Sequence, residues 1–244
     1  MRGSLKSRSM SDSAPMRSAP IHLRPTAPLA ERALLPGDPG RALALAQSLL
    51  SEPRMFNHNR GLWGYTGAAS DGEPLTIQAT GMGGPSAAIV LTELIGMGVR
   101  RAIRVGTCGA LAPSLELGAL LVAREAICAD GTSRALGAGA RTSGDASLTE
   151  ALLQAAPSAQ AGTVVSVDLF YESAGQRETH DALAVEMEAA TLFAVGAAEK
   201  VAVACVLVVS DTFDANGARE RIEDAAMLSA AETMGAVAIA ALSA

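Results

Sequence analysis

The stretch VAVACVLVVSD, residues 201–211, is the part of the chain that most restricts its possible folds. Its first nine residues are all apolar, and five of them are valine, which favours extended structure. A strand with one wet face would alternate apolar and polar side chains, whereas an unbroken apolar run indicates a strand that is buried on both faces. The sequence therefore predicts an interior strand, within a sheet that is covered on both sides.

Shorter apolar runs alternate with helical patterns along the rest of the chain. The strands that we expect lie within residues 32–35, 75–80, 101–111, 118–127 and 161–170. Strands that alternate with helices are typical of α/β folds, in which ligands gather at the carboxyl ends of the strands. The 244 residues are enough for one sizeable α/β domain, which we assign to residues 21–244.

Capping residues and apolar spacing place the helices. Asp38 is a favourable N-cap and Pro39 a favourable first helical residue, so a helix is expected to begin there. A later helix is expected to bury an apolar face through Ile89, Leu91 and Leu94. That helix is expected to begin at Pro85, and two further helices are expected at residues 185–198 and 221–242.

The first 20 residues are rich in Ser, Arg and Pro and show no apolar periodicity, so we expect a disordered leader. They lack the apolar centre of a secretory signal, which leaves a transit peptide as the alternative. The three cysteines, at positions 108, 128 and 205, are too widely spaced for a disulfide framework or a CxxC metal site. A reducing cytoplasm is therefore the expected location.

Composition argues against several classes of function. The formal net charge is −6, aromatic residues make up 3%, and the body of the chain has no Lys/Arg run, so binding of nucleic acid is not expected. No stretch approaches 18 uninterrupted apolar residues, so no membrane span is expected. No metal site is expected either, because the three histidines, His22, His58 and His180, stand in different segments.

The stretch GDPGRA places a glycine turn in front of a helix. Gly37 allows a backbone N–H to approach an anion, and Arg41 adds charge one turn into the helix. The alternative is an ordinary strand-to-helix turn. A second glycine turn, TGMGGPS, fails the dinucleotide pattern GxGxxG because Ser86 stands where glycine is required, which leaves a tight turn or a backbone contact with a small ligand.

The stretch RVGTCGAL, residues 104–111, indicates an oxyanion pocket on a glycine-kinked turn at the end of a strand. Arg104 offers a fork of donors suited to phosphate, Thr107 adds a hydroxyl, and the glycines would expose backbone N–H groups. The alternatives are a surface arginine, or an arginine that is paired within the chain with Glu125 or Glu186.

Two further stretches place carboxylates beside apolar segments. Glu186 and Glu188 flank Met187 near a helix start, where a buried carboxylate would need partners such as sugar hydroxyls. Asp211 ends the most apolar strand and is a candidate general acid, because apolar surroundings raise the pKa of a carboxyl group. Arg221 would then control its protonation. The alternatives are a solvated helix end and a helix cap.

Seven stretches, taken in order, resemble the nucleoside phosphorylase family, which includes hexameric purine nucleoside phosphorylases, methylthioadenosine phosphorylases and uridine phosphorylases. They are LLPGDPGRA, NHNRGLWGYTG, TGMGGPSAAIV, RVGTCGAL, VDLFY, VEMEAATLF and VVSD, and they cover the chain from Ile21 to the C-terminus. The resemblance implies a single-domain α/β fold with a central mixed β-sheet that forms a partial barrel flanked by helices. It also implies a hexamer built as a trimer of dimers.

The resemblance also implies roles for particular residues. A phosphate site is implied at Gly37, Arg41, Arg60, Arg104 and Thr107. Ribose contacts are implied for His22, Met82, Met187 and Glu188. A base pocket is implied at Cys108, Gly109, Phe170, Glu186 and Ser210. Asp211 would protonate the purine with Arg221 as its helper, whereas His22 and Arg60 would come from the neighbouring subunit.

The activity that follows is phosphorolysis of purine nucleosides, with inorganic phosphate as co-substrate and without a metal or organic cofactor. The pair Ser210-Asp211 favours purines, because uridine phosphorylases carry an arginine just after the equivalent strand. Gln176-Arg177 resembles the Gln-x-Arg with which uridine phosphorylases read uracil, although no residue separates the two here. Uridine phosphorylase, methylthioadenosine phosphorylase, a hydrolytic nucleosidase and a non-catalytic nucleoside-binding relative remain alternatives.

Overall fold

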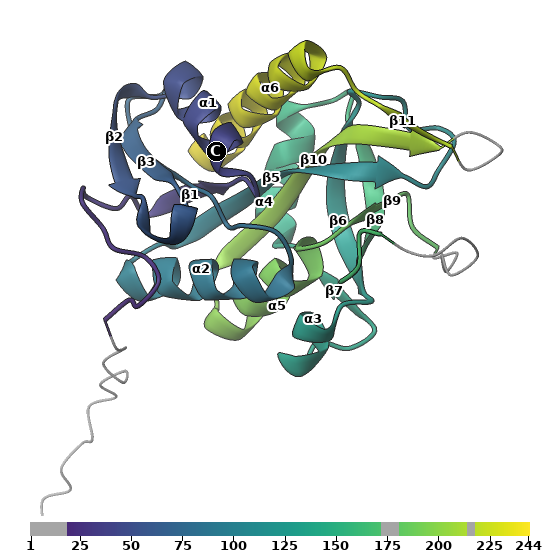
Figure 1. Cartoon of the computed structure of the whole chain (residues 1–244), viewed down its shortest axis with the longest axis horizontal. Helices are drawn as coiled ribbons and strands as arrows, with labels where there is room; N and C mark the ends of the chain where they lie inside the picture. Colours follow the sequence, from purple (N-terminus) through teal and green to yellow (C-terminus); the bar gives the residue numbers. More distant parts are fainter. Residues whose placement is uncertain (1–18, 172–180, 214–217) are drawn as a thin grey trace, which may run out of the picture.

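The computed structural model describes residues 19–171, 181–213 and 218–244, whose strands join one mixed sheet (Figure 1). The strands are β1 (Arg32–Leu35), β2 (Ser51–Asn57), β3 (Gly64–Ala68), β4 (Pro74–Gln78), β5 (Arg101–Ala110), β6 (Leu120–Cys128), β7 (Arg141–Ser143), β8 (Gln160–Ser166), β9 (Ala184–Glu186), β10 (Ala202–Phe213) and β11 (Arg219–Arg221). The helices are α1 (Pro39–Leu49), the 3-10 turn η1 (Asn59–Gly61), α2 (Gly84–Met97), α3 (Gly131–Ala135), α4 (Ala146–Ala155), α5 (Ala189–Glu199) and α6 (Asp224–Ser243).

Five of the strands close on themselves. The pairing runs from β10 through β6, β8 and β9 to β5, and β5 pairs again with β10 in parallel. The strands β1, β4, β3 and β2 continue the sheet outward from β5. Parallel and antiparallel pairs both occur, since β10 runs antiparallel to β6 and β9 antiparallel to β5. This arrangement confirms the predicted mixed sheet that forms a partial barrel.

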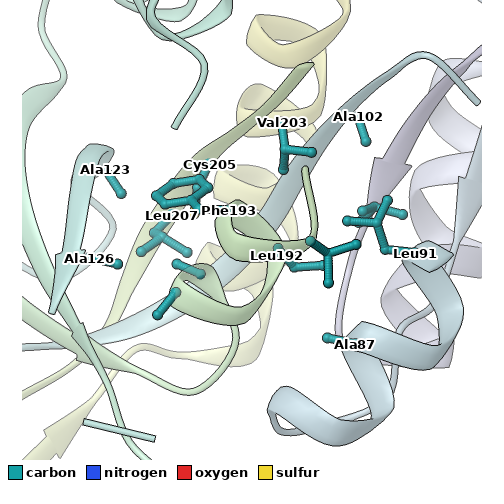
Figure 2. Close-up of a cluster of buried hydrophobic side chains, with 14 of the residues drawn as sticks. Ala87, Leu91, Ala102, Ala123, Ala126, Leu192, Phe193, Val203, Cys205 and Leu207 are labelled. Atoms are coloured by element: carbon teal, nitrogen blue, oxygen red, sulfur yellow. The ribbon is translucent and has the colours of Figure 1, made fainter. Parts of the chain in front are cut away.

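The apolar strand β10 lies inside the sheet, as its sequence predicts. Alternate side chains, such as Val203 and Cys205, belong to a core that is covered by α2 and α5. The intervening side chains, such as Ala204 and Val206, belong to a second core, covered by α1, α4 and α6. Figure 2 shows part of the first core, where Leu207 of β10 lies near Phe193 of α5. Both faces are thus buried, which explains the lack of polar alternation.

The helix starts follow the capping signals closely. Asp38 caps α1 by accepting a hydrogen bond from the backbone N–H of Gly40, and Pro39 is the first helical residue. In α2, Leu91 and Leu94 are buried as expected, but Ile89 is 40% exposed, so its predicted place on the buried face is wrong. The buried face of α2 runs instead through Val90, because the core contacts follow positions 87, 90, 91, 94 and 95.

Several expected boundaries differ from the structure. The strand expected to reach residue 170 ends at Ser166, so Phe170 stands in the following connection. The helix expected from residue 185 begins at Ala189, after the short strand β9. The helix expected from Arg221 begins at Asp224, because Arg221 pairs with β10 as the last residue of β11.

The last helix, α6, is long and apolar enough to cross a membrane by length and composition alone. Part of it is core, however: Met234, Ala238 and Leu242 are buried in the cluster that also contains residues of α1 and α4. An inner face that packs against neighbouring helices is typical of a core helix in a globular domain.

Candidate active site

Buried polar side chains gather where β5, β9 and β10 meet the starts of α2 and α5. The most enclosed are Arg104, Glu186, Glu188, Ser166 and Asp211, all with 7% or less of their surface exposed. Charged side chains are rarely buried this deeply unless they are paired. Their partners therefore define what this site can do.

The stretch 104–109 is not the glycine-kinked turn that its composition predicts. It lies within β5 and pairs in parallel with β10, where Arg104 stands opposite Cys205 and Gly106 opposite Leu207. One edge of this stretch thus pairs with β10, whereas on the other edge β1 pairs only as far as Arg104 and β9 only from Gly109 onward. Gly106 has a different purpose: a Cβ atom there would lie 2.6 Å from Cζ of Arg104, so the guanidinium lies flat over this glycine.

Arg104 is paired with two carboxylates. Its Nε donates to Oε2 of Glu186 over 3.0 Å, and its Nη2 lies 2.5 Å from Oε2 of Glu188. The predicted alternative of an internal ion pair with Glu186 is therefore confirmed. Glu125, the other candidate partner, binds Nη1 of Arg141 over 2.6 Å instead.

The two carboxylates also cap the helix starts. Glu186 accepts the backbone N–H groups of Glu188 and Ala189 at about 2.9 Å, and it accepts the hydroxyl of Ser166. Oε1 of Glu188 accepts the N–H of Gly83 over 2.5 Å, just before α2. The unpaired N–H groups of two helix N-termini are thus satisfied by side chains.

The charges of this cluster shift the pKa values of its members. Burial alone would lower the pKa of Arg104, but Glu188 and Glu186 outweigh it and raise the pKa well above its usual value. Burial raises the pKa of Glu186; Arg104 opposes this shift and Glu188 adds to it. One guanidinium shared between two buried carboxylates leaves the second carboxylate poorly compensated.

Two further arginines stand close to this cluster. Burial lowers the pKa of Arg41, and the charges of Arg104 and Arg221 lower it further, although Asp38 opposes them. The guanidiniums of Arg104 and Arg221 are therefore near enough to Arg41 for their charges to act on it. A Cβ atom at Gly37 would lie 3.4 Å from the carbonyl oxygen of Gly81, so the two predicted glycine turns are also neighbours.

Asp211 has an acceptor atom with no hydrogen bond. Its Oδ2 accepts the hydroxyl of Ser210 over 2.7 Å, whereas its buried Oδ1 has no hydrogen-bond partner within the described residues. Nε of Arg219 stands 3.8 Å from Oδ1. Buried acceptors are nearly always satisfied, so an exception of this kind is typical of a functional group.

The ion pair with Asp211 is made by Arg219, whereas the helper role of Arg221 stays a prediction. Arg221 stands directly opposite Asp211 in the β10–β11 ladder, but among the described residues only Arg219 is within ion-pair distance of this carboxylate. The guanidinium of Arg219 also lies 4.5 Å from the ring centre of Phe170 and 5.5 Å from that of Phe213. Both arginines stand in the stretch ARERIED, and the register of the β10–β11 hairpin determines which of them lies near Asp211.

The residues expected around the base stand between Arg104 and Asp211. Cys108 is buried, and burial, with Glu186, raises the pKa of its thiol to about 12, so it is not a nucleophile at neutral pH. Gly109 pairs with Asp211, and a Cβ atom at Gly109 would lie 3.4 Å from Phe213. Phe170 is 46% exposed.

The remaining predicted residues lie at the edges of the cluster. Thr107 is partly exposed on β5 and Met187 is partly exposed between Glu186 and Glu188, whereas Met82, next to Gly83, is 83% exposed. Gln176 and Arg177 lie outside the described residues, as do positions 1–18 of the expected leader.

His22 and Arg60 are not brought into this cluster. Nδ1 of His22 lies 2.7 Å from Oε1 of Glu93, a residue of α2. Arg60 is exposed in η1, with a left-handed backbone (φ 58°). Their assignment to a neighbouring subunit stays a prediction. Sequence reasoning missed four residues that the cluster uses, namely Ser166, Gly83, Arg219 and Phe213; of these only Gly83 lay in a motif that glycine spacing had marked.

Known proteins resemble this chain over most of its length. The sequence profile of the phosphorylase superfamily matches residues 31–243. "Purine nucleoside phosphorylase DeoD-type" of Geobacillus kaustophilus is 36% identical over 201 residues, which are 76% of this chain and 83% of the relative. The protein of the same name from Caldanaerobacter subterraneus is 34% identical over 79% of this chain and 89% of its own. "Uridine phosphorylase" of Treponema pallidum is 36% identical over 72% and 75%.

Proposed function

Because this chain belongs to the phosphorylase superfamily, we propose that it is a pentosyltransferase acting on purine nucleosides. It cleaves the N-glycosidic bond of purine ribonucleosides and deoxyribonucleosides with inorganic phosphate and releases the free base and (deoxy)ribose 1-phosphate. The observation that carries this proposal is the buried Asp211, whose Oδ1 has no hydrogen-bond partner among the described residues. Several relatives that are 34–36% identical are named purine nucleoside phosphorylases, which supports the same activity.

The site has a cationic end and an acidic end, on two paired strands. Arg104 stands opposite Cys205, and Asp211 stands opposite Gly109, five residues further along β5. Five residues of strand span roughly 16 Å, and the guanidinium of Arg104, which lies over Gly106, shortens this separation to about 10 Å. That interval accommodates a ribose with its base between the two ends.

Charge development in the reaction matches these two ends. Breaking the glycosidic bond leaves positive charge on the sugar and negative charge on the base. Asp211 donates a proton to the base, and Arg219 steadies its carboxylate afterwards. Phosphate held by Arg41 and Arg104, with Gly37, Thr107 and a partner's Arg60, attacks the anomeric carbon, so that positioning and electrostatics provide the rate.

The ribose lies between the phosphate and the base. Each oxygen of Glu188 has one partner, Gly83 N–H or Arg104, and a carboxylate oxygen has two lone pairs, so Glu188 can still accept bonds from a vicinal diol. Met187 directly precedes Glu188, and Met82 directly precedes Gly83, whose N–H binds Glu188, so both methionines are placed to cover the sugar. Glu186 holds Arg104 and the start of α5 in place rather than reaching the base directly.

Assembly and location follow from the same proposal. We propose a homo-oligomer, a hexamer made of dimers, in which His22 and Arg60 complete the neighbour's site. The protein works in purine salvage in the cytoplasm and needs inorganic phosphate but no metal or organic cofactor. Size measurement by light scattering and assay in the presence of a chelator test these statements directly.

A substrate panel tests the base preference. Inosine, adenosine, methylthioadenosine and uridine are incubated with and without phosphate, and the free base is measured. We expect cleavage of purine nucleosides only when phosphate is present. Uridine turnover without purine turnover would point to the second candidate, which the relative named uridine phosphorylase supports, and cleavage without phosphate would make the protein a hydrolase.

Asp211→Asn tests the acid. The amide cannot donate a proton as a carboxylic acid does, so purine turnover should fall by about 10²- to 10⁴-fold. Phosphate binding, measured by calorimetry, should be retained because the arginines are untouched. Asp181→Asn is the matched control, because Asp181 is fully exposed and its Oδ2 makes only a long contact of 4.0 Å with Nη2 of Arg141. Unchanged purine turnover in Asp211→Asn would refute the role of this residue.

A further inference from the structure

Arg219, on β11, stands at the outer end of the site. It pairs with Phe213, which lies two residues beyond Asp211 along β10 (Figure 1). Arg104 pairs with Cys205, which lies six residues before Asp211 on the same strand. The order along β10 therefore places the cationic end of the site on one side of Asp211 and the backbone of Arg219 on the other side.

Two aromatic rings and one carboxylate surround the guanidinium of Arg219. Its Cζ lies 4.5 Å from the ring centre of Phe170 and 5.5 Å from that of Phe213, within the range of cation–π attraction. Its Nε lies 3.8 Å from Oδ1 of Asp211, which is too far for a hydrogen bond. The rings hold the guanidinium in place without using its N–H groups as conventional donors. Within the described residues, these donors thus remain available beside Asp211.

The two classes of purine differ at the edge that meets Asp211. A 6-oxopurine presents two acceptors there, N7 and O6, whereas a 6-aminopurine presents the acceptor N7 beside an N–H donor. In the purine ring, N7 separates C8, which adjoins the ribose-bearing N9, from the side that carries the 6-substituent. If Asp211 meets N7 and the ribose extends toward Arg104, the 6-substituent points away from Arg104. That is the side on which Arg219 stands.

We propose that Arg219 selects 6-oxopurine nucleosides, such as inosine and guanosine, by donating a hydrogen bond to O6 of the base. The proposal rests on the proposed function. Cleavage leaves negative charge on the base, and in a 6-oxopurine this charge spreads to O6, so a cation there stabilises the transition state more than the substrate. A 6-amino group offers no acceptor to the guanidinium. Arg219 transfers no proton, because a guanidinium stays charged, and Asp211 supplies the proton to N7.

Paired substrates separate selection of the base from loss of structure. Inosine and adenosine are compared at saturating phosphate in wild type, Arg219→Met and Arg219→Lys. The intrinsic reactivity of each nucleoside is the same for every variant, so a change in the ratio of their kcat/KM values reports the protein alone. We expect the wild type to favour inosine. Loss of one hydrogen bond to a guanidinium that is 32% exposed should lower the ratio about tenfold in Arg219→Met, mainly through kcat.

Arg219→Lys tests whether a cationic donor is what selects the base. A lysine ammonium keeps the positive charge and can donate to O6, although it lacks the planar fork of arginine. The ratio of inosine to adenosine cleavage should therefore lie between the values of wild type and Arg219→Met. A lysine variant with the same ratio as the methionine variant would overturn the proposal.

The control is Arg124→Met, an exposed arginine on β6 that pairs with Glu150 on α4, and it should change neither substrate. An equal loss for both nucleosides in Arg219→Met would overturn the proposal, because lost structure or lost support of Asp211 affects both bases alike. A wild type that prefers adenosine would overturn it as well. A ratio that changes in Arg221→Met but not in Arg219→Met would assign the base contact to the wrong arginine and have the same consequence.

Binding of the free bases separates failure of this inference from failure of the proposed function. Calorimetric titration with hypoxanthine and with adenine, in the presence of phosphate, requires no turnover. We expect hypoxanthine to bind wild type more tightly than adenine and the difference to shrink in Arg219→Met. If the wild type cleaves no purine nucleoside, the proposed function fails, yet this difference would still support the contact. Equal binding of the two bases, or binding of neither, would overturn the inference whether or not nucleosides are cleaved.

Discussion

Gly106→Ala tests how closely the strand and the guanidinium of Arg104 are matched. A Cβ atom at this position would lie 2.6 Å from Cζ, 2.8 Å from Nη2 and 2.9 Å from Nη1 of Arg104. Carbon atoms in contact normally stand about 3.5–4.0 Å apart. The guanidinium must therefore move by about 1 Å, and it has little freedom to do so because Glu186 and Glu188 bind it from the other side.

The size of the effect follows from this displacement. A shift of about 1 Å in a positioned group can lower activity by about 10²-fold. Overpacking a core costs about 1–3 kcal/mol, which for a chain of this size corresponds to about 2–12 °C in Tm. We therefore expect kcat/KM for phosphate to fall about 10²-fold in Gly106→Ala, while the protein stays folded at room temperature.

The assay varies phosphate at saturating inosine and records Tm for each variant. Gly235→Ala is the matched control, because a Cβ there would press on Leu49 and Leu45, between α6 and α1, and not on a guanidinium. It should shift Tm but leave the dependence on phosphate unchanged. Gly106→Ala with wild-type kcat/KM for phosphate would refute the argument, because the guanidinium would then not need its place above this glycine.

Two further outcomes follow from the charges of the structure. Arg219→Met should lower kcat for inosine about tenfold with little change in the KM for phosphate, because Nε of Arg219 lies 3.8 Å from Oδ1 of Asp211. Arg221→Met should lower kcat less, because among the described residues Arg219 alone is within ion-pair distance of Asp211, and equal effects would contradict the assignment. Hydrogen bonds from Arg32 hold the pKa of Asp71 well below its usual range. The stability that this pair contributes is complete above about pH 4 and is lost as the pH falls through the lowered pKa, so Tm between pH 7 and pH 3 should fall less steeply in Asp71→Asn than in wild type.

Local signals predicted the parts of the fold that depend on neighbours in the sequence. Asp38 and Pro39 mark the start of α1 because capping involves only a few successive residues. The apolar run of β10 indicates burial on both faces without any knowledge of what covers them. The cap and the interior strand are therefore found in the structure where the sequence places them.

Features that depend on contacts between distant segments could not be predicted from the sequence. The glycines after Arg104 indicated a turn, but β10 offers them a parallel ladder, and Gly106 makes room for a side chain instead. The choice between Arg219 and Arg221 depends on the register of the β10–β11 hairpin, which fixes which guanidinium is near Asp211. Spacing in the sequence cannot fix a register of this kind.

The balance of charge at the cluster explains how an acidic chain can hold a small anion. The net charge of −6 argues against polyanions, and the arginines near the cluster, Arg104, Arg41, Arg221 and Arg219, are matched by the carboxylates Glu186, Glu188, Asp211 and Asp38. A small anion is therefore held by the local placement of donors rather than by an excess of positive charge. Phosphate must compete with two carboxylates for the guanidinium of Arg104. Within the described residues, Nε binds Glu186 and Nη2 binds Glu188, which leaves Nη1 for phosphate. Since burial raises the pKa of Glu186, an arriving anion adds to the repulsion on this carboxylate, whereas the guanidinium of Arg104 keeps its place above Gly106 and between the two carboxylates.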